Sequence, residues 1–517
     1  IMSSDWSSDV CSSDLAGVFA VFRHLWRAIR VVRCLGKHGA ILFIDEMPIT
    51  PWQRRVLHWL NDDEAPGRPG QRLARALIEL GPIYIKLGQG FGTRPDIVGQ
   101  GVAEDLTDLQ DKLPPFSGEE AVKRIEIELE QPLAAVFAEF RREPVAAASI
   151  AQVHKARTAD GRDVAVKVVR PGIEHDIEQD LRFFAFMAWL GERVLPHSER
   201  LHPQEAVRVF AETTRRELDM RIEAAAADEF RENNREAPKF YVPAVDWQRT
   251  SKRVLTLEWI EGVASDEPDK LVAMGVDPAK VLETASKVFF AHVFVHGFFH
   301  GDMHPGNTFI RPDGTIVPID YGIMGRLDFE TRLFLGELLV VFLNRNYARL
   351  AEVMVKGRLV PDHVDRGALA QSIRAMAEPI MGLPQNEISI ARLLGQLFEV
   401  AGEFEMRARP DLLLLQKTMM VAEGVGRALN PRVNMWQLAQ PLVEDWIALN
   451  LGPVGATRRF AADGRDVMER LPRVVRETDD LLAKLRADGE RRGRGDGMLA
   501  RPLLWLLVGL ALGALLR

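Results

Sequence analysis

Cysteine is almost absent from this chain, since Cys11 and Cys34 are the only two among 517 residues. Two cysteines exclude a disulfide framework and leave no cysteine-based zinc site, so we expect a protein of a reducing compartment. An excess of positive charge is lacking as well. The net charge of −7 argues against a general nucleic-acid-binding function.

Long apolar runs are scarce in a chain of 27% charged and 47% hydrophobic residues, a composition typical of a globular protein of two or three domains. The exception is Pro502–Leu516, an apolar run of 15 residues behind the charged, glycine-rich segment 486–497. As a helix this run would be about 22 Å long, short of a hydrocarbon core of about 30 Å. We nevertheless expect segment 498–517 to associate with a membrane, because a terminal apolar helix behind a linker has little to pack on.

The N-terminal residues carry two different signals. Segment 1–15 repeats Ser-Ser-Asp three times, and its VCSSDL matches the translation of a sequencing adapter. We interpret it as an artefact, exclude it, and expect the natural start to be missing. Segment 16–35 has a basic amphipathic pattern that is typical of a helix on an anionic membrane surface, and packing on its own domain explains it equally well. Its arginines recur every three or four places: Arg23, Arg27, Arg30 and Arg33.

The most informative stretch is segment 296–322, which reads HGFFHGDMHPGNTFIRPDGTIVPIDYG. An apolar helix end over 293–299 is expected to deliver Asp302 into a loop. Two short apolar runs, 308–310 and 315–319, flank a Pro-Asp-Gly turn and therefore predict a β-hairpin.

Asp302, Asn307 and Asp320 stand in this stretch at the spacing H-x-D-x-x-x-x-N followed by D-x-G. Phosphoryl transfer from ATP needs one Asp to accept or orient a proton, while an Asn and a second Asp hold Mg²⁺ against the phosphates. We therefore assign catalysis to Asp302 and the metal to Asn307 and Asp320. A structural turn or a capping Asp would explain each motif alone, but the ordered set favours a nucleotide site.

A second β-hairpin is expected between Pro144 and Pro171, with its turn at Asp160-Gly161. The strand VAVK alternates so that Lys167 lies on the face opposite the valines. In kinase-like folds a lysine at this place contacts the α- and β-phosphates of ATP. VAVK alone is an ordinary strand, and only the downstream stretch gives it this meaning.

Glycine is missing where protein kinases have a glycine-rich loop, and alanines replace it. Alanine lets the backbone approach phosphate but narrows the φ/ψ choices that glycine keeps open, so we predict a stiffer loop with an altered nucleotide preference. The predicted nucleotide-binding loop consists of Val145, Ala146, Ala147, Ala148, Ser149, Ile150, Ala151, Gln152 and Val153.

One acidic side chain must neutralise Lys167, and helices expected over 173–236 offer three candidates. Glu217, Asp219 and Glu223 lie in ELDMRIEAAAADEF, with the last two four residues apart on one helical face. An exposed charged face is the default explanation of such acids. Glu223 is nevertheless the candidate partner of Lys167.

These elements predict an α+β, protein-kinase-like, two-lobed fold with a helix-rich C-lobe. The strand VLTLEW at 254–259 is expected at the edge or hinge of the sheet, and helices are expected from Gly322 to about Leu485. A helix over 72–90 carries Lys86 three residues before Gln89, which usually indicates a solvated pair. The predicted units are an N-terminal helical extension (16–116), an N-lobe (117–262), a helical C-lobe (263–485), a linker (486–497) and a membrane-associated apolar helix (498–517).

From about Arg72 to Gly325 these motifs resemble the UbiB family, the atypical kinase-like proteins associated with ubiquinone biosynthesis. KLGQ, which begins at Lys86, is similar to the family's K-x-G-Q motif, and Glu217-Leu218-Asp219 is similar to its E-x-D motif. An alanine-rich loop replaces the glycine-rich one in that family too. The resemblance implies an ion pair of Lys167 with Glu223, catalysis by Asp302, a role in turnover for Lys86, and Mg²⁺ ligation by Asn307 and Asp320.

The resemblance also implies ATP and Mg²⁺ as cofactors. It favours an ATPase over a protein kinase, because the K-x-G-Q helix covers the place where a peptide would dock. The implied role is accessory to ubiquinone biosynthesis at the bacterial inner membrane, with the kinase-like domain in the cytoplasm. Implied partners are membrane lipid, quinone precursors and other ubiquinone-biosynthesis proteins, and a second apolar helix is expected beyond Arg517.

Two alternatives stay open from the sequence. The first is a small-molecule phosphotransferase of the aminoglycoside or choline kinase type, whose HGDxHxxN loop is nearly identical to His300–Asn307. The second is a nucleotide-binding scaffold without turnover that organises a membrane complex. The K-x-G-Q helix, the alanine-rich loop and the apolar tail favour the UbiB-like reading over the first.

Overall fold

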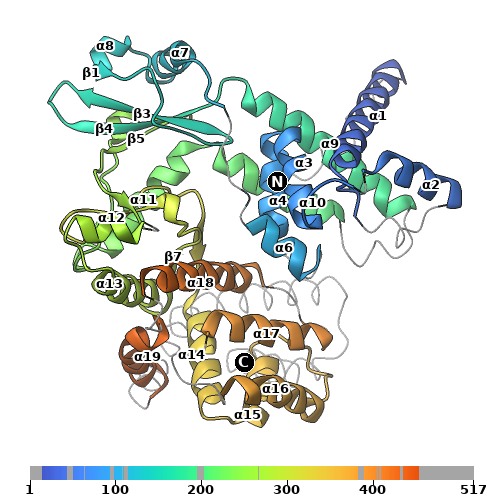
Figure 1. Ribbon diagram of the computed structural model, residues 1–517, viewed down its shortest axis with the longest axis vertical. Helices are drawn as coiled ribbons and strands as arrows, with labels where there is room; N and C mark the ends of the chain where they lie inside the picture. Colours follow the sequence, from blue (N-terminus) through green and yellow to red (C-terminus); the bar gives the residue numbers. More distant parts are fainter. Residues whose placement is uncertain are drawn as a thin grey trace, which may run out of the picture.

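The computed structural model describes residues 14–42, 50–62, 64–92, 98–107, 109, 114–194, 203–265, 267–381, 389–404, 406, 409–430 and 435–452. The predicted linker 486–497 and apolar segment 498–517 lie outside these residues. Within them, no helix is both long enough and apolar enough to cross a membrane. Figure 1 shows a small sheet at one end, the C-lobe helices at the other, and the N-terminal helices to one side.

The sheet of the N-lobe has five antiparallel strands in the order β1-β3-β4-β5, and β2 pairs with β3. The predicted hairpin with its turn at Asp160-Gly161 is confirmed, and Ala156 lies opposite Val164 in its register. The predicted edge strand is confirmed as the last in this order. The strands are β1 (Phe137–Phe140), β2 (Ala146–Ala147), β3 (Ala151–Thr158), β4 (Asp163–Val169) and β5 (Val254–Glu258).

Alternation along β4 decides which side chains enter the N-lobe core. Val164, Val166 and Val168 are buried in a cluster with the helices that cover this face, whereas Lys167 points to the other side, as predicted. These covering helices are α7 (Gly118–Leu129) and α8 (Leu133–Val136).

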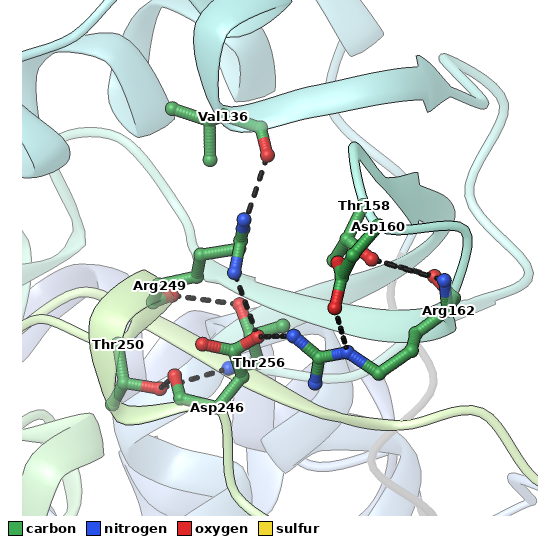
Figure 2. A network of polar contacts seen from close by, with 8 residues as sticks. All are labelled: Val136, Thr158, Asp160, Arg162, Asp246, Arg249, Thr250 and Thr256. Carbon is green, nitrogen blue, oxygen red and sulfur yellow. Dashed lines mark hydrogen bonds and ion pairs between the residues drawn. The ribbon is translucent and has the colours of Figure 1, made fainter.

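A network of polar contacts links the β3–β4 turn to β5 and α8 (Figure 2). The carboxylate of Asp246 lies 3.1 Å from the guanidinium of Arg162, at the β3–β4 turn, and 2.9 Å from that of Arg249. Arg249 also donates to the Val136 carbonyl at 3.0 Å, and Thr256 of β5 donates to the Arg249 carbonyl at 2.7 Å. Asp246 is buried, so these charge-assisted bonds fix β4, β5 and α8 relative to one another.

Three helices connect the lobes: α9 (Ile173–Val194), α10 (Pro203–Glu217) and α11 (Met220–Asn233). The prediction that Asp219 and Glu223 share a helical face is wrong, because α10 ends at Glu217 and Asp219 is the N-cap of α11. Its side chain accepts a hydrogen bond from the Arg221 amide, as N-cap residues do. Glu223 therefore lies in the first turn of a separate helix.

The N-terminal extension is helical, as predicted, and packs on α9. Tyr84 lies edge-on to Phe184 of α9 with ring centroids 5.2 Å apart, and Ile83 and Ile85 are fully buried. Its described helices are α1 (Asp14–Lys37), α2 (Pro51–Leu60), α3 (Pro69–Leu80), α4 (Pro82–Gly92) and α6 (Gln100–Thr107).

The central stretch differs from prediction at its start. The helix end expected over 293–299 is confirmed only as far as His296, where a π-helical turn (His292–His296) ends. Phe298–His300 forms strand β7 instead, paired with β10 (Met324–Arg326). Gly297 has φ +63°, and a Cβ there would lie 2.4 Å from the Leu327 carbonyl oxygen, so this reversal requires glycine.

The hairpin predicted after Asp302 is confirmed by β8 (Thr308–Ile310) and β9 (Ile316–Pro318), with β6 (Val263–Ala264) pairing on the other side of β8. A helix-rich C-lobe is also confirmed over the described residues. Its helices are α12 (Pro268–Ala273), α13 (Pro278–Ala291), α14 (Phe329–Leu343), α15 (Tyr347–Lys356), α16 (Arg366–Met381), α17 (Ile390–Glu403), α18 (Pro410–Leu429) and α19 (Met435–Leu451).

Candidate nucleotide-binding site

His300 ties the two ends of the central stretch together. Its ring is fully buried, and Nε2 donates to the Asp320 carbonyl oxygen at 2.5 Å while Nδ1 accepts from the Asp302 amide at 3.1 Å. One nitrogen donates and the other accepts, so the ring is neutral. Burial lowers the pKa of His300 by more than the nearby Asp320 and Asp302 carboxylates raise it, which agrees with a neutral ring.

The β8–β9 hairpin brings Asn307 and Asp320 to the same end. Thr308 lies opposite Pro318 in the register, and the Ile319 amide donates to the Asn307 carbonyl at 2.9 Å. The Asn307 amide nitrogen lies 3.3 Å from Oδ2 of Asp302. The hairpin thus places Asp302, Asn307 and Asp320 around one small region.

Lys167 reaches this region from the sheet above. Its Nζ lies 2.8 and 2.9 Å from the two carboxylate oxygens of Glu223 and 3.4 Å from Oδ1 of Asp320. Glu223 also accepts from the Tyr321 amide at 3.4 Å. One ammonium therefore lies between a helix carboxylate and a carboxylate of the lower lobe.

The two carboxylates around Lys167 differ in environment. Burial raises the pKa of Glu223, whose side chain is 6% exposed. For Asp320 the raising effect of burial is outweighed by Lys167 and by the Gly322 amide, which donates to Oδ1 at 3.0 Å, so its pKa is lowered. Burial also lowers the pKa of Lys167, but Asp320 and Glu223 outweigh it and keep the ammonium charged.

The alanine-rich loop is a tight hairpin of its own. Val145 donates to the Val153 carbonyl and Ala148 to the Ala151 carbonyl, each at 2.8 Å. Arg170 holds the turn through two bonds to the Ala148 carbonyl at 3.2 and 2.9 Å. The loop is therefore fixed by its own backbone and by one arginine.

Four side chains of this loop point into the protein. Ser149, Ile150, Ala151 and Gln152 are buried, and the Gln152 amide exchanges hydrogen bonds with the backbone of Phe116 at 3.0 and 3.2 Å. Contacts with phosphate from this stretch would come from backbone groups and from the outer residues of β2.

Lys86 lies on α4, in the helical extension, and forms an ion pair with Glu217 at the end of α10. The two side chains are only 11% and 21% exposed, so the interpretation of Lys86 and Gln89 as a solvated pair is wrong. Gly88 faces the helix interface, where a Cβ would lie 2.6 Å from Leu77 Cδ1. The K-x-G-Q and E-x-D motifs therefore meet through a half-buried charge pair.

Two residues of α18 also contact the segment His300–Asn307, which we call the catalytic loop, and neither was predicted from the sequence. Lys417 Nζ lies 3.7 Å from Oδ1 of Asp302, and the Thr418 hydroxyl donates to the Gly301 carbonyl at 3.0 Å. They stand in a helix far along the chain that carries no motif of its own. His300 was also outside the predicted set, although its place in H-x-D could have indicated it.

Comparisons with known proteins match two domain families to this chain. Residues 108–354 match the ABC1 atypical kinase-like domain, and residues 373–434 match the UbiB helical domain. Two relatives named probable protein kinase UbiB come from Marinobacter nauticus and Aeromonas salmonicida. The first is 38% identical over 435 residues, covering 83% of this chain and 80% of the relative, and the second is 37% identical over 512 residues, covering 94% and 93%.

A solved structure, the Rv3197–erythromycin complex from Mycobacterium tuberculosis, is 28% identical, with a TM-score of 0.48, and the match covers 69% of this chain and 90% of that one. The sequence relatives establish the family, because each match covers at least 80% of both chains. The chain belongs to the UbiB family of atypical kinase-like proteins.

Proposed function

We propose that this protein binds Mg-ATP between its lobes and hydrolyses it in support of ubiquinone biosynthesis at a membrane. The observation that carries the proposal is the convergence of Lys167, Glu223 and Asp320, together with the contact between Asp302 and Asn307. Lys167 lies opposite Val153 of the alanine-rich loop in the register of β3 and β4. ATP chemistry uses this combination of one ammonium, one amide and separated carboxylates.

Lys167 is proposed to bind the α- and β-phosphates, and Glu223 to hold its ammonium in position. The loop over 145–153 would cover the phosphates, and its backbone amides would supply the contacts that the buried side chains cannot. The two hydrogen bonds from Arg170 to the Ala148 carbonyl keep this loop stiff.

The donor set around Asn307 and Asp320 fits Mg²⁺, which prefers oxygen ligands. Asp320 is charged, its side chain is 41% exposed, and the Asn307 amide supplies a neutral oxygen. When bound, the ion would neutralise charge on the phosphates. We therefore propose Asn307 and Asp320 as its ligands.

Asp302 is proposed to accept the proton of the attacking water. The water oxygen forms a bond to the terminal phosphorus as the bond from that phosphorus to the bridging oxygen breaks. The electron pair leaves with ADP, and inorganic phosphate is formed. Asp302 is 32% exposed at the loop, so it can reach both water and substrate.

We propose hydrolysis rather than peptide phosphorylation because the K-x-G-Q helix would cover the place where a peptide substrate docks. Ion pairs tie the N-terminal extension that carries this helix to the lobes. The Lys86–Glu217 pair and the Arg27–Asp180 pair, at 2.7 Å, fasten its helices to α9 and α10. A small-molecule phosphotransferase does not need this fastened extension.

A membrane-facing surface is proposed on α1 and α2. On α1, His24 stacks on Phe186 with centroids 4.9 Å apart and Arg27 pairs with α9, which turns the apolar side outward. α2 has no buried residue. We call the outward set the aromatic face: Phe22, Leu25, Trp26, Ile29, Trp52, Val56 and Trp59.

Trp26 and Trp59 are 74% and 82% exposed, and the exposed Arg23 and Arg30 flank Trp26 on α1. Exposed tryptophan beside arginine is typical of a helix at an anionic lipid interface. This supports membrane association of the extension, with the apolar segment 498–517 as a second proposed anchor. Both would hold the catalytic centre near membrane-borne quinone precursors.

The proposed function is tested by phosphate release from ATP, with and without anionic liposomes and a phenolic quinone precursor. Asp320→Asn removes a full charge from the proposed Mg²⁺ site, so nucleotide binding in a thermal-shift titration should lose its Mg²⁺ dependence. Unchanged Mg²⁺-dependent binding contradicts the metal assignment. Efficient transfer of phosphate to aminoglycosides or generic peptides by the parent protein would contradict the ATPase assignment.

A further inference from the structure

We propose that Lys417 is a further catalytic residue, which contacts the terminal phosphate of ATP during transfer. The inference rests on the proposed function, because it assumes that ATP is hydrolysed at Asp302. It adds a cation that no motif of the sequence supplies, delivered by α18 of the C-lobe helices.

Helix α18 is packed directly on the catalytic loop. The Thr418 hydroxyl donates to the Gly301 carbonyl at 3.0 Å, and a Cβ on Gly301 would lie 3.1 Å from Leu414 Cδ1. Thr418 is fully buried. The backbone around Lys417 is therefore fixed relative to the backbone of Asp302.

Lys417 forms a long ion pair with Asp302. The distance from Nζ to Oδ1 is 3.7 Å, beyond an ordinary hydrogen bond. No acceptor lies within hydrogen-bond distance of Nζ in the part of the chain that the structure describes. An ammonium that is only 15% exposed thus keeps its donors for an acceptor that arrives beside Asp302.

The negative charges of Asp302 and of a terminal phosphate beside it would be stabilised by such a cation. Lys167 is held by Glu223 and Asp320, and the loop between Asp302 and Asn307 contains no lysine or arginine. A terminal phosphate that approaches Asp302 would meet a like charge. Lys417, next to the Asp302 carboxylate, offsets that repulsion.

The effect is greatest in the transition state. As the water oxygen bonds to the terminal phosphorus and the bond to the bridging oxygen breaks, charge spreads over the outer phosphate oxygens and the leaving oxygen. A fixed ammonium that donates to an outer oxygen stabilises this charge more than it stabilises bound ATP. Asp302 takes the proton, and ADP leaves with the electron pair.

The test compares Lys417→Met, which keeps the apolar stem, with Lys417→Arg and with the control Arg427→Gln. Arg427 lies on the same helix, about 15 Å further along, and is 60% exposed. We expect Lys417→Met to lower kcat about 100-fold, as loss of one preorganised donor does, with the Kd for ATP within about threefold of the parent. Lys417→Arg should recover part of kcat, and Arg427→Gln should match the parent.

A kcat for Lys417→Met equal to that of the control overturns the inference, and so does a parallel loss of ATP affinity and kcat. If Lys417→Met is unstable by circular dichroism, Lys417→Cys alkylated with bromoethylamine rebuilds the ammonium, and recovery of kcat supports the inference. Unchanged low activity after alkylation overturns it. A parent that binds ATP without turnover would overturn the proposed function together with this inference.

Discussion

The Lys167 ammonium lies 2.8 Å from the Glu223 carboxylate and thereby joins strand β4 to helix α11. The pair is buried, so each partner depends on the other for compensation of its charge. Asp320 approaches the same ammonium from the lower lobe at 3.4 Å. A single cluster of three charges therefore connects the sheet of the N-lobe to the lower lobe.

We expect Lys167→Met to weaken ATP binding at least tenfold, about 1.4 kcal/mol, because phosphate charge loses its ammonium. The melting temperature should also fall, since Glu223 is left buried without a partner. Adding Glu223→Gln should restore the melting temperature without restoring ATP affinity. Isothermal titration with ATP and a melting curve separate the two effects, and parental ATP affinity in Lys167→Met would contradict the assignment.

The Lys86–Glu217 pair predicts an effect on turnover rather than on nucleotide affinity, because it lies between α4 and α10 and not in the Lys167 cluster. We expect Lys86→Met and Glu217→Gln each to lower kcat about tenfold with the Kd for ATP unchanged. The double variant should be no worse than either single one, as for residues that act as a unit. Changes in melting temperature alone, with kcat unaffected, would show the pair to be only structural.

Short-range patterns predicted much of this site. Period-two alternation placed Lys167 opposite the valines of β4, and the Pro-Asp-Gly turn placed Asn307 and Asp320 at one end of a hairpin. These features depend on residues no further apart than Asn307 and Asp320, and a sequence displays such short separations directly.

Other features depend on distant neighbours and were missed or misread. The apolar run Phe298–His300 fits a helix or a strand, and its pairing with β10 decides between them. Helical spacing pairs Lys86 only with Gln89 of its own helix, whereas Glu217 arrives from α10. Lys417 has no local signal at all, because its meaning comes from the packing of α18 on Gly301.

The aromatic face predicts binding to anionic membranes that depends on two exposed tryptophans. Trp26→Ser combined with Trp59→Ser should weaken co-sedimentation with phosphatidylglycerol vesicles about tenfold, because interfacial aromatic contact is lost. Trp247→Ser, at a 47% exposed site in the N-lobe, is the matched control. The comparison should be repeated without residues 498–517, and equal binding of both variants in that background would contradict the assignment.

His292 predicts how stability depends on pH. It is buried, its Nε2 donates to Asn234 Oδ1 at 2.7 Å, and its ring centroid lies 4.5 Å from that of Phe230. Burial, with smaller contributions from His296 and His300, lowers the pKa of His292 from 6.5 to about 3. The folded protein therefore keeps this ring neutral at pH values where the unfolded chain protonates it.

This difference makes the free energy of unfolding decrease as pH falls. Between pH 6.5 and about 3 the unfolded state binds the extra proton, so the contribution of His292 is fully present above pH 6.5 and is lost as pH falls. At pH 5 the loss is about 2 kcal/mol, since one pKa unit corresponds to about 1.4 kcal/mol. His292→Gln keeps a donor for Asn234 but does not titrate, so urea unfolding of this variant should depend less on pH between 7 and 5. His363→Gln, at an exposed position, should leave the parental slope unchanged, and an equal slope in His292→Gln would show that His292 is not the group responsible.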